Sequence, residues 1–186
     1  MLLMKTALEE TVALPNGITA TLADGIMTVK GPKGEVSRAM RDPLLSVKVA
    51  GNNVVIACAK GTKRQKRVIN SFVAHLNNMI TGVQQPYQYR LKICSGHFPM
   101  NVSVSGEQLI IKNFLGEKSP RTLKLKKGVS VKVEGDQIVI ESPDKELAGQ
   151  AASDIELLTA KRNRDLRVFQ DGIYLIEKAG KKISEI

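Results

Sequence analysis

The amino-acid sequence contains one pattern twice. Three pairs of segments match in their apolar alternation and in the placement of their turn residues: residues 15–20 and 99–104, 25–30 and 108–112, and 50–56 and 134–140. In the first pair Pro15 and Pro99 lie 84 residues apart. This separation exceeds the period of roughly 20–50 residues that is typical of solenoids and propellers. The repeat therefore predicts two copies of a small domain.

Each copy contains a hairpin followed by a helix. Alternating residues on both sides of a Gly/Asn or Gly/Asp turn predict antiparallel hairpins over residues 47–56 and 129–140. The first helix is expected over roughly residues 66–80, capped at its C-terminal end by Gly82, because apolar residues recur there at helical spacing. Those apolar residues are Ile69, Phe72, Val73, Leu76, Met79 and Ile80.

The second helix carries a different start signal. We expect it to begin at Ser142 and Pro143, because a hydroxyl cap followed by proline suits the first helical position. Its predicted apolar stripe is Leu147, Ala151, Ile155 and Leu158. One helix with an antiparallel sheet, present twice, predicts an α+β fold of two tandem, topologically similar domains. We place these domains at residues 1–82 and 83–186, the second with a basic C-terminal segment.

Charge is the unusual feature of the composition. The 28 Lys and Arg residues against 18 Asp and Glu residues give a formal net charge of +10, and tryptophan is absent. This balance indicates a polyanionic partner rather than a typical enzyme. No apolar run approaches the ~20 residues that span a bilayer, and the opening segment 1–5 is too short for a signal-peptide core. Cys58 and Cys94 form neither a metal clip nor a disulfide framework, so we expect a reduced, cytoplasmic setting without a membrane partner.

The basic residues gather in three clusters. The first is Lys60, Lys63, Arg64, Lys66 and Arg67, the second is Lys118, Arg121, Lys124, Lys126 and Lys127, and the third is Lys161, Arg162, Arg164 and Arg167. The first cluster lies at a helix start, where the macrodipole disfavours cations but free backbone amides suit a phosphate. We therefore expect Lys63, Arg64, Lys66 and Arg67 to meet a phosphate of the polyanionic partner.

Each cluster also has a plainer interpretation. Basic side chains at a helix start can simply be solvated, and lysines on the strand around residues 122–126 can protect a sheet edge. The third cluster follows a helix, whose C-terminal end favours cations in any case. Three clusters in one chain nevertheless favour contacts with a phosphate backbone at several points.

The side chains that enzymes use are few in this sequence. His75 lies on the flank of the first helix, and His97 is expected to be a hydrogen-bonded structural residue. Cys58 sits in an apolar strand and is expected to be a core residue. The segment 31–34 lacks the spacing of a phosphate loop and is typical of a type I turn. No enzymatic activity, cofactor, metal or small-molecule substrate is therefore indicated. Were an activity detected, His97 and Cys94 would be the first side chains to substitute.

Five motifs in register carry a resemblance to a known family: residues 29–34, 75–83, 96–100, 111–118 and 168–174. In order and spacing they resemble the sixth universal protein of the large ribosomal subunit, over roughly residues 8–179. The turn at residues 113–118 and the segment 169–174 are most similar to the archaeal branch, with the eukaryotic branch close by. Pro86 and Gly96 depart from the family pattern in the stretch between the two domains.

The resemblance implies a structural role in ribosome assembly and translation. It implies a position near the sarcin–ricin loop and the stalk base, with ribosomal RNA and neighbouring large-subunit proteins as partners. The second domain would make the main RNA contacts, through Asn113, Phe114, Gly116, Lys118, Arg121, Arg162, Arg164, Gly172 and Tyr174. The charge clusters add the helix-start residues and, on the basic strand, Lys124 and Lys126.

A rival hypothesis is an RNA- or DNA-binding module that acts away from the ribosome. It would share the basic surface but would bind any duplex weakly and without specificity. Competition between ribosomal RNA and an unrelated duplex would separate the two hypotheses.

Overall fold

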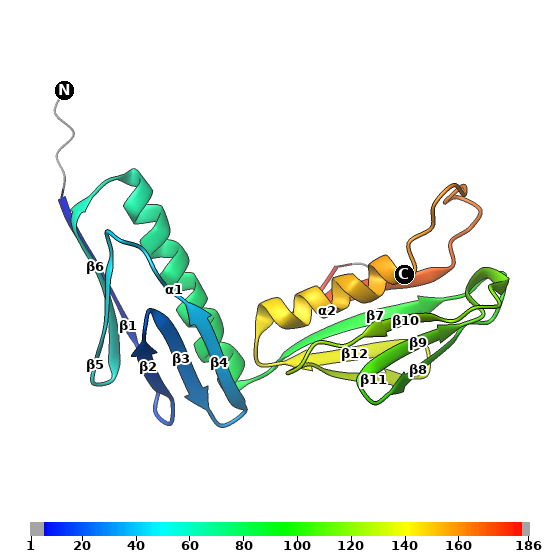
Figure 1. The fold of residues 1–186 in the computed structure, drawn as a ribbon, viewed down its shortest axis with the longest axis horizontal. Helices are drawn as coiled ribbons and strands as arrows, with labels where there is room; N and C mark the ends of the chain where they lie inside the picture. Colours follow the sequence, from blue (N-terminus) through cyan, green and yellow to red (C-terminus); the bar gives the residue numbers. More distant parts are fainter. Residues whose placement is uncertain (1–5, 184–186) are drawn as a thin grey trace. The chain divides into compact units, whose positions relative to one another are not determined.

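The computed structural model describes residues 6–183 and divides the chain into two compact units, Met1–Pro86 and Tyr87–Ile186 (Figure 1). Each unit contains one long helix and antiparallel strands, which confirms the predicted α+β fold with a duplicated domain. The division follows Pro86 rather than residue 82, because the first helix continues beyond Gly82. The opening segment 1–5 lies outside the described residues.

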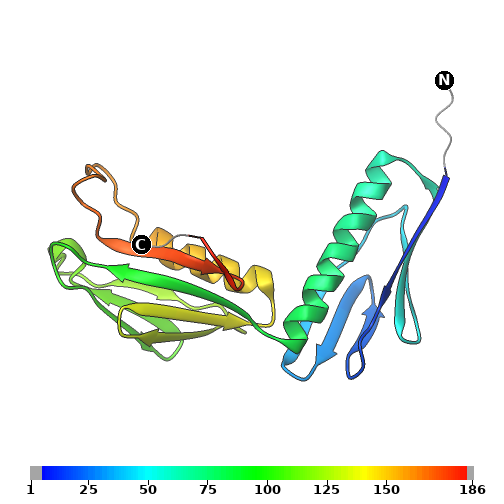
Figure 2. The same cartoon turned by 180° about the vertical axis from the view of Figure 1, so that it is seen from behind.

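Unit 1 has two three-stranded antiparallel sheets and one helix. The first sheet has the order β1-β6-β5 and the second the order β2-β3-β4. The strands are β1 (Thr6–Ala13), β2 (Thr19–Ala23), β3 (Ile26–Gly31), β4 (Gly34–Ala39), β5 (Ser46–Ala50) and β6 (Asn53–Gly61). Helix α1 (Lys63–Gln84) packs against strands of both sheets (Figure 2). The predicted hairpin over residues 47–56 is confirmed as β5 and β6.

The core of unit 1 follows from the two periodicities of its sequence. On β6, Val54, Ile56 and Cys58 alternate inward, and on α1, Ile69 and Leu76 are among the buried residues. These side chains belong to one buried apolar cluster. The prediction that Cys58 is a core residue is confirmed.

Helix α1 begins and ends at clear local signals. Thr62 is the N-cap: its side chain accepts from the backbone N–H of Arg64 at 3.3 Å, and its own N–H donates to Gln65 Oε1 at 3.2 Å. Gly82 is buried inside the helix, so its predicted role as a C-terminal cap is wrong. The helix ends at Gln84 because Pro86 disfavours helical backbone at Gln85, which is extended.

Unit 2 has a five-stranded sheet with the order β11-β12-β7-β13-β14 and a three-stranded sheet with the order β10-β9-β8. The strands are β7 (Tyr87–Cys94), β8 (Asn101–Ser105), β9 (Gln108–Lys112), β10 (Arg121–Lys124), β11 (Ser130–Glu134), β12 (Gln137–Ser142), β13 (Gly172–Lys178) and β14 (Lys181–Lys182). The hairpin predicted over residues 129–140 is confirmed as β11 and β12. The short 3-10 turn η1 (Phe114–Gly116) follows β9. Strands β13 and β14 follow helix α2 and have no counterpart in unit 1, where no strand follows α1 among the described residues.

Helix α2 (Lys145–Leu158) starts later than the sequence suggests. Its N-cap is Asp144, whose carboxylate accepts from the N–H of Glu146 at 2.8 Å. Ser142 is instead the buried last residue of β12, and its hydroxyl donates to the carbonyl of Gly128 at 2.9 Å. The prediction that Ser142 caps this helix is therefore wrong.

The buried face of α2 is made of small residues. Ala148, Ala151, Ala152 and Ile155 are buried, whereas Leu147 is only half-buried. Small side chains let the helix approach the sheet closely: a Cβ at Gly149 would lie 3.3 Å from the Tyr89 hydroxyl. Among residues 6–183 no helix is long and apolar enough to cross a membrane.

Candidate nucleic-acid interface

The turn after β9 is the first part of the candidate site. Asn113, Leu115 and Gly116 have left-handed backbone, with φ of 60°, 50° and 78°. The Asn113 side chain donates to the carbonyl of Pro99 at 3.1 Å. A Cβ at Gly116 would lie 3.6 Å from the ring of Phe98. Asn113 and Gly116, two of the predicted contact residues, therefore also shape this turn.

Arg121, the first residue of β10, joins this turn to helix α2. Its Nε donates to Glu117 Oε2 at 2.8 Å, and a second nitrogen pairs with the other carboxylate oxygen. A third donor reaches the carbonyl of Leu158, the last residue of α2, at 2.6 Å. The hydrogen bond from Arg121 lowers the pKa of the Glu117 carboxyl. Arg121 is thus engaged on three sides within unit 2.

Phe114 does not face solvent. Its side chain is 1% exposed within the core of unit 2, and the Arg121 guanidinium lies 4.2 Å from its ring centroid. A buried ring offers no face on which a base could stack, and the predicted contact of Phe114 with RNA stays a prediction. The Phe114 ring packs against the guanidinium of Arg121 and anchors the turn at residues 113–118 in the core.

The lysines around β10 reach solvent as the alternating sequence predicts. Lys118, Lys124 and Lys126 are exposed, while Leu123 is half-buried against the core. Lys126 pairs with Asp154 of α2 at 3.2 Å. No polar contact within residues 6–183 engages Lys118 or Lys124, so both ammonium groups are available to a phosphate.

The third basic cluster lies on the segment between α2 and β13, here called loop 160–171 (Figure 1). Arg162, Arg164 and Arg167 are exposed. The Arg164 guanidinium lies 4.8 Å from the ring centroid of Phe169, and Arg167 pairs with Asp165 at 2.9 Å. The loop therefore presents arginines on a surface that its own residues organise.

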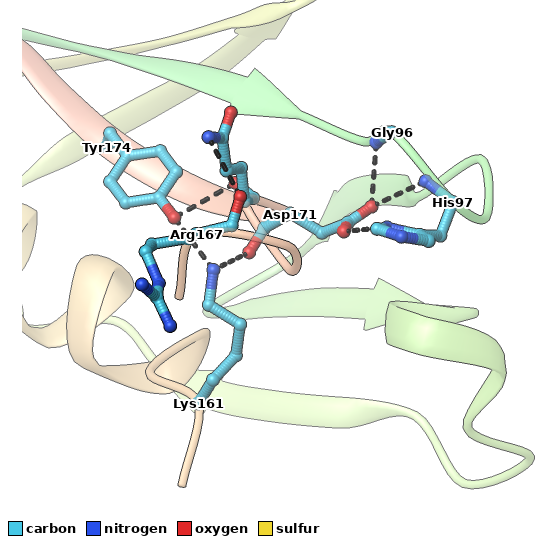
Figure 3. Close-up of polar contacts among 7 residues, drawn as sticks. Gly96, His97, Lys161, Arg167, Asp171 and Tyr174 are labelled. Carbon is cyan, nitrogen blue, oxygen red and sulfur yellow. Dashed lines mark hydrogen bonds and ion pairs between the residues drawn. The ribbon is translucent and has the colours of Figure 1, made fainter. Parts of the chain in front are cut away.

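Lys161 differs from the other members of this cluster because it points inward. Its ammonium group donates to the backbone carbonyl of Asp171 and lies 2.8 Å from the Tyr174 hydroxyl (Figure 3). The Tyr174 hydroxyl in turn donates to the carbonyl of Gln170 at 3.0 Å. Lys161 thus connects the two ends of loop 160–171.

Gly172 and Tyr174 form a close pair at the start of β13. The Tyr174 ring covers Gly172 so closely that a Cβ there would lie 3.2 Å from the ring and its hydroxyl. Gly172 is buried. Their predicted contact with RNA remains a prediction, but the packing gives both residues a role inside the unit.

Asp171 is a buried residue at the end of loop 160–171 that the sequence pattern does not single out. Its side chain is 2% exposed, and one carboxylate oxygen accepts from the backbone N–H groups of Gly96 and His97 at 2.7 and 2.9 Å (Figure 3). The other oxygen lies 2.6 Å from His97 Nδ1. Burial alone raises the pKa of Asp171, but the hydrogen bonds from His97 and Gly96 outweigh it and bring the pKa to about 2. We call Gly96, His97 and Asp171 the Asp171 junction.

Two sequence clusters converge around one hollow in unit 2. The hollow has a volume of about 480 Å³. Its lining residues are Phe114, Leu115, Glu117, Arg121, Leu157, Leu158, Ala160, Lys161, Arg162 and Arg164. The turn at residues 113–118, the start of β10 and loop 160–171 thus form a single basic surface. Four of the predicted contact residues of the second domain line it: Phe114, Arg121, Arg162 and Arg164.

The helix-start cluster belongs to unit 1. Lys63, Arg64, Lys66 and Arg67 are all exposed in the first turns of α1, and no acidic residue accompanies them in the first turn. Their contact with a phosphate stays a prediction.

His97 and Cys94 are the two side chains that the sequence singles out for a possible activity. His97 is hydrogen-bonded to Asp171, which confirms its interpretation as a hydrogen-bonded structural residue. Cys94 lies opposite Gly172 in the sheet. Within residues 6–183 no group of three or more His, Cys, Asp and Glu side chains could hold a metal ion.

A duplicated α+β fold with a basic surface of this kind is typical of proteins that bind a polyanion such as a nucleic acid. The chain belongs to the ribosomal protein L6 family, whose model matches residues 14–86 and 98–172. The two matched segments coincide with the two copies of the sequence repeat.

Similar proteins are found in archaea, as the resemblance to the archaeal branch predicts. The chain is 44% identical over 182 residues to the large ribosomal subunit protein uL6 of Nanoarchaeum equitans, covering 94% of this chain and 95% of that protein. It is 40% identical to the protein of the same name from Methanosarcina mazei over 176 residues, covering 95% of this chain and 100% of the relative. The relative from Methanobrevibacter smithii is 41% identical over 177 residues, covering 95% and 99%.

Proposed function

We propose that this protein is a structural constituent of the large ribosomal subunit and binds ribosomal RNA through unit 2. The observation that carries this proposal is the convergence of Arg121, Arg162 and Arg164 around one hollow, from segments about 40 residues apart in the chain. The basic side chains neutralise phosphates, while the fixed turns match the shape of a folded RNA. Membership of the ribosomal protein L6 family supports the same conclusion.

The finer position that we propose is near the sarcin–ricin loop and the stalk base, in ribosomes of the cytoplasm. There the protein would contact neighbouring large-subunit proteins and support assembly and translation without a catalytic role. In this arrangement Lys118, Lys124 and Lys126 line one flank of the RNA contact, and Arg162 and Arg164 the other. The exposed residues Lys63, Arg64, Lys66 and Arg67 give unit 1 a second, separate phosphate contact.

The test is sedimentation of a cell lysate through sucrose gradients at low and high salt, followed by blotting for this chain. We expect the protein to travel with the large subunit and to remain there at high salt, because contacts that match RNA shape do not depend on charge alone. A protein that stays at the top of the gradient, or washes off as salt rises, would support a non-specific nucleic-acid-binding module instead.

A matched pair of variants locates the contact. Arg162→Gln with Arg164→Gln removes two charges from the proposed surface, and Lys48→Gln with Lys132→Gln removes two charges from exposed strand positions outside all three clusters. Only the first pair should reduce incorporation into the large subunit. Equal loss in both pairs would argue against a defined surface.

A further inference from the structure

Two loops far apart in the sequence are joined by the Asp171 junction. Gly96 and His97 follow β7, and Asp171 is the last residue of loop 160–171. The buried carboxylate of Asp171 accepts hydrogen bonds from the backbone N–H groups of Gly96 and His97 and from the ring nitrogen Nδ1 of His97, at distances of 2.6 to 2.9 Å (Figure 3). The end of the loop is therefore fixed to a neighbouring segment by three charge-assisted hydrogen bonds.

The junction continues outward to an arginine of the RNA surface. The His97 ring stacks on Phe169, with centroids 4.9 Å apart and an interplanar angle of 26°. The guanidinium of Arg164 lies over that same Phe169 ring at 4.8 Å. An unbroken series of contacts thus runs from the buried Asp171 carboxylate through two rings to the exposed Arg164.

The middle of the loop has little structure of its own. Residues 162–168 are all exposed and lie outside any helix or strand. The hydrogen bonds described for this stretch stay inside the loop and centre on Asp165, which accepts from the backbone N–H groups of Arg167, Val168 and Phe169. The shape of the arginine-bearing segment consequently depends on how its ends are held.

We propose that Asp171 and His97 are positioning residues for RNA binding: the hydrogen bond from His97 Nδ1 to the Asp171 carboxylate holds loop 160–171 in the shape in which Arg162 and Arg164 meet RNA phosphates. The proposal rests on the proposed function of unit 2. A loop that is already ordered spends less conformational entropy when it binds. The His97 side chain is 38% exposed, so it can act beside the RNA while its Nδ1 edge faces Asp171.

Two substitutions of His97 separate the hydrogen bond from the ring. His97→Phe keeps an aromatic ring against Phe169 and removes the Nδ1 donor. His97→Asn removes the ring and places an amide nitrogen near the position of Nδ1. The probe is archaeal large-subunit ribosomal RNA, with an unrelated RNA duplex as the control, and the full-length chain is used throughout.

Without the hydrogen bond to Asp171, we expect loop 160–171 to adopt its binding shape about one-tenth of the time. His97→Phe should therefore weaken binding to ribosomal RNA by about 10-fold, because the apparent affinity falls with the fraction of molecules that are ready to bind. His97→Asn should bind more tightly than His97→Phe, since it keeps the donor to Asp171 although it loses the ring that stacks on Phe169. Faster hydrogen exchange at the Gly96 amide in Asp171→Asn would show that the junction has opened. Normal binding by His97→Phe, or equal weakening by both His97 variants, would overturn the proposal.

A double-mutant comparison distinguishes failure of this proposal from failure of the proposed function. In the background Arg162→Gln with Arg164→Gln, His97→Phe should cause no further loss, because it acts through those arginines. If the arginine variant itself binds like the unmodified chain, the proposed RNA surface is wrong. If the arginines matter but His97→Phe adds its full effect in both backgrounds, the positioning role is wrong. Thermal unfolding of each variant identifies any that fail to fold.

Discussion

The hydroxyl of Thr159 accepts a hydrogen bond from the backbone N–H of Ile173 at 2.9 Å, and both residues are buried. Thr159 is the C-cap of α2, and Ile173 is the second residue of β13. A second side chain of α2, Glu156, accepts from the N–H of Leu175 at 3.4 Å. Helix α2 therefore satisfies two backbone donors of β13 with side chains, which fixes where loop 160–171 leaves the helix and enters the sheet.

Thr159→Val should destabilise unit 2. Valine has nearly the same shape but no oxygen, so the buried N–H of Ile173 would lose its partner at a cost of about 1–3 kcal/mol. Urea unfolding of the full chain and hydrogen exchange at the Ile173 amide measure the effect. Thr159→Ser keeps the hydroxyl and serves as the control. Unchanged stability in the valine variant would mean that water or another group replaces the hydroxyl.

Gly31→Ala should destabilise unit 1. A Cβ at Gly31 would lie 2.7 Å from Cγ2 of Val83, a fully buried residue of α1, so the turn between β3 and β4 must move away from the helix. Overpacking of this kind costs about 1–3 kcal/mol. The control is Gly96→Ala, because no atom lies within 4 Å of the added Cβ and the change should stay within about 0.5 kcal/mol. Denaturant unfolding of both variants checks the contrast.

Arg121→Lys should weaken unit 2 although it preserves the charge. An ammonium group cannot hold both oxygens of Glu117 and the carbonyl of Leu158 in one fork, so we expect a loss of about 1–2 kcal/mol. Thermal unfolding measures the loss, with Lys124→Arg at an exposed position of the same strand as the control. Full stability in Arg121→Lys would show that the guanidinium geometry is dispensable.

Asp171→Asn should reduce stability at neutral pH and lose its effect in acid. The hydrogen bonds from His97 and Gly96 hold the pKa of Asp171 at about 2, below its ordinary value of 3.8. A carboxyl with a depressed pKa in the folded state stabilises the fold above about pH 4, and this contribution disappears as the pH falls towards 2. The difference in unfolding free energy between the two proteins should therefore shrink from pH 4 to pH 2. A difference that stays constant over that window would contradict the assignment.

Local signals explain how much of the fold the sequence predicts. Alternation on both sides of a Gly-containing turn identifies β5 with β6 and β11 with β12, and helical spacing identifies α1. The Gly82 error arises because a glycine can be buried within a helix when a later proline supplies the stop. The Ser142 error arises because two candidate caps lie two residues apart, and the strand takes the first of them.

The candidate site depends on contacts that sequence spacing does not reveal. Asp171 accepts from Gly96 across 75 residues, and no pattern near either residue indicates the other. Because Phe114 lies in a turn with polar neighbours, the sequence predicts that its ring is exposed. In the structure the residues on both sides of Phe114, Asn113 and Leu115, have left-handed backbone, and the Phe114 ring is buried in the core. The basic clusters are visible in the sequence because charge is local, but their convergence is a property of the fold.

The salt dependence of RNA binding should reveal which lysines meet phosphates. Lys118 and Lys124 are exposed and have no polar contact within residues 6–183, so each is free to replace a condensed counterion. Replacing one phosphate-binding lysine with glutamine should flatten the slope of log affinity against log salt by about 0.7–0.9. We therefore expect a flatter slope for Lys118→Gln and Lys124→Gln, measured with archaeal large-subunit ribosomal RNA between about 50 and 200 mM salt. Lys132→Gln, at an exposed position of β11 outside the clusters, should leave the slope unchanged. If all three variants share one slope, the lysines act only through the net charge of the chain, and the RNA contact must be carried by loop 160–171.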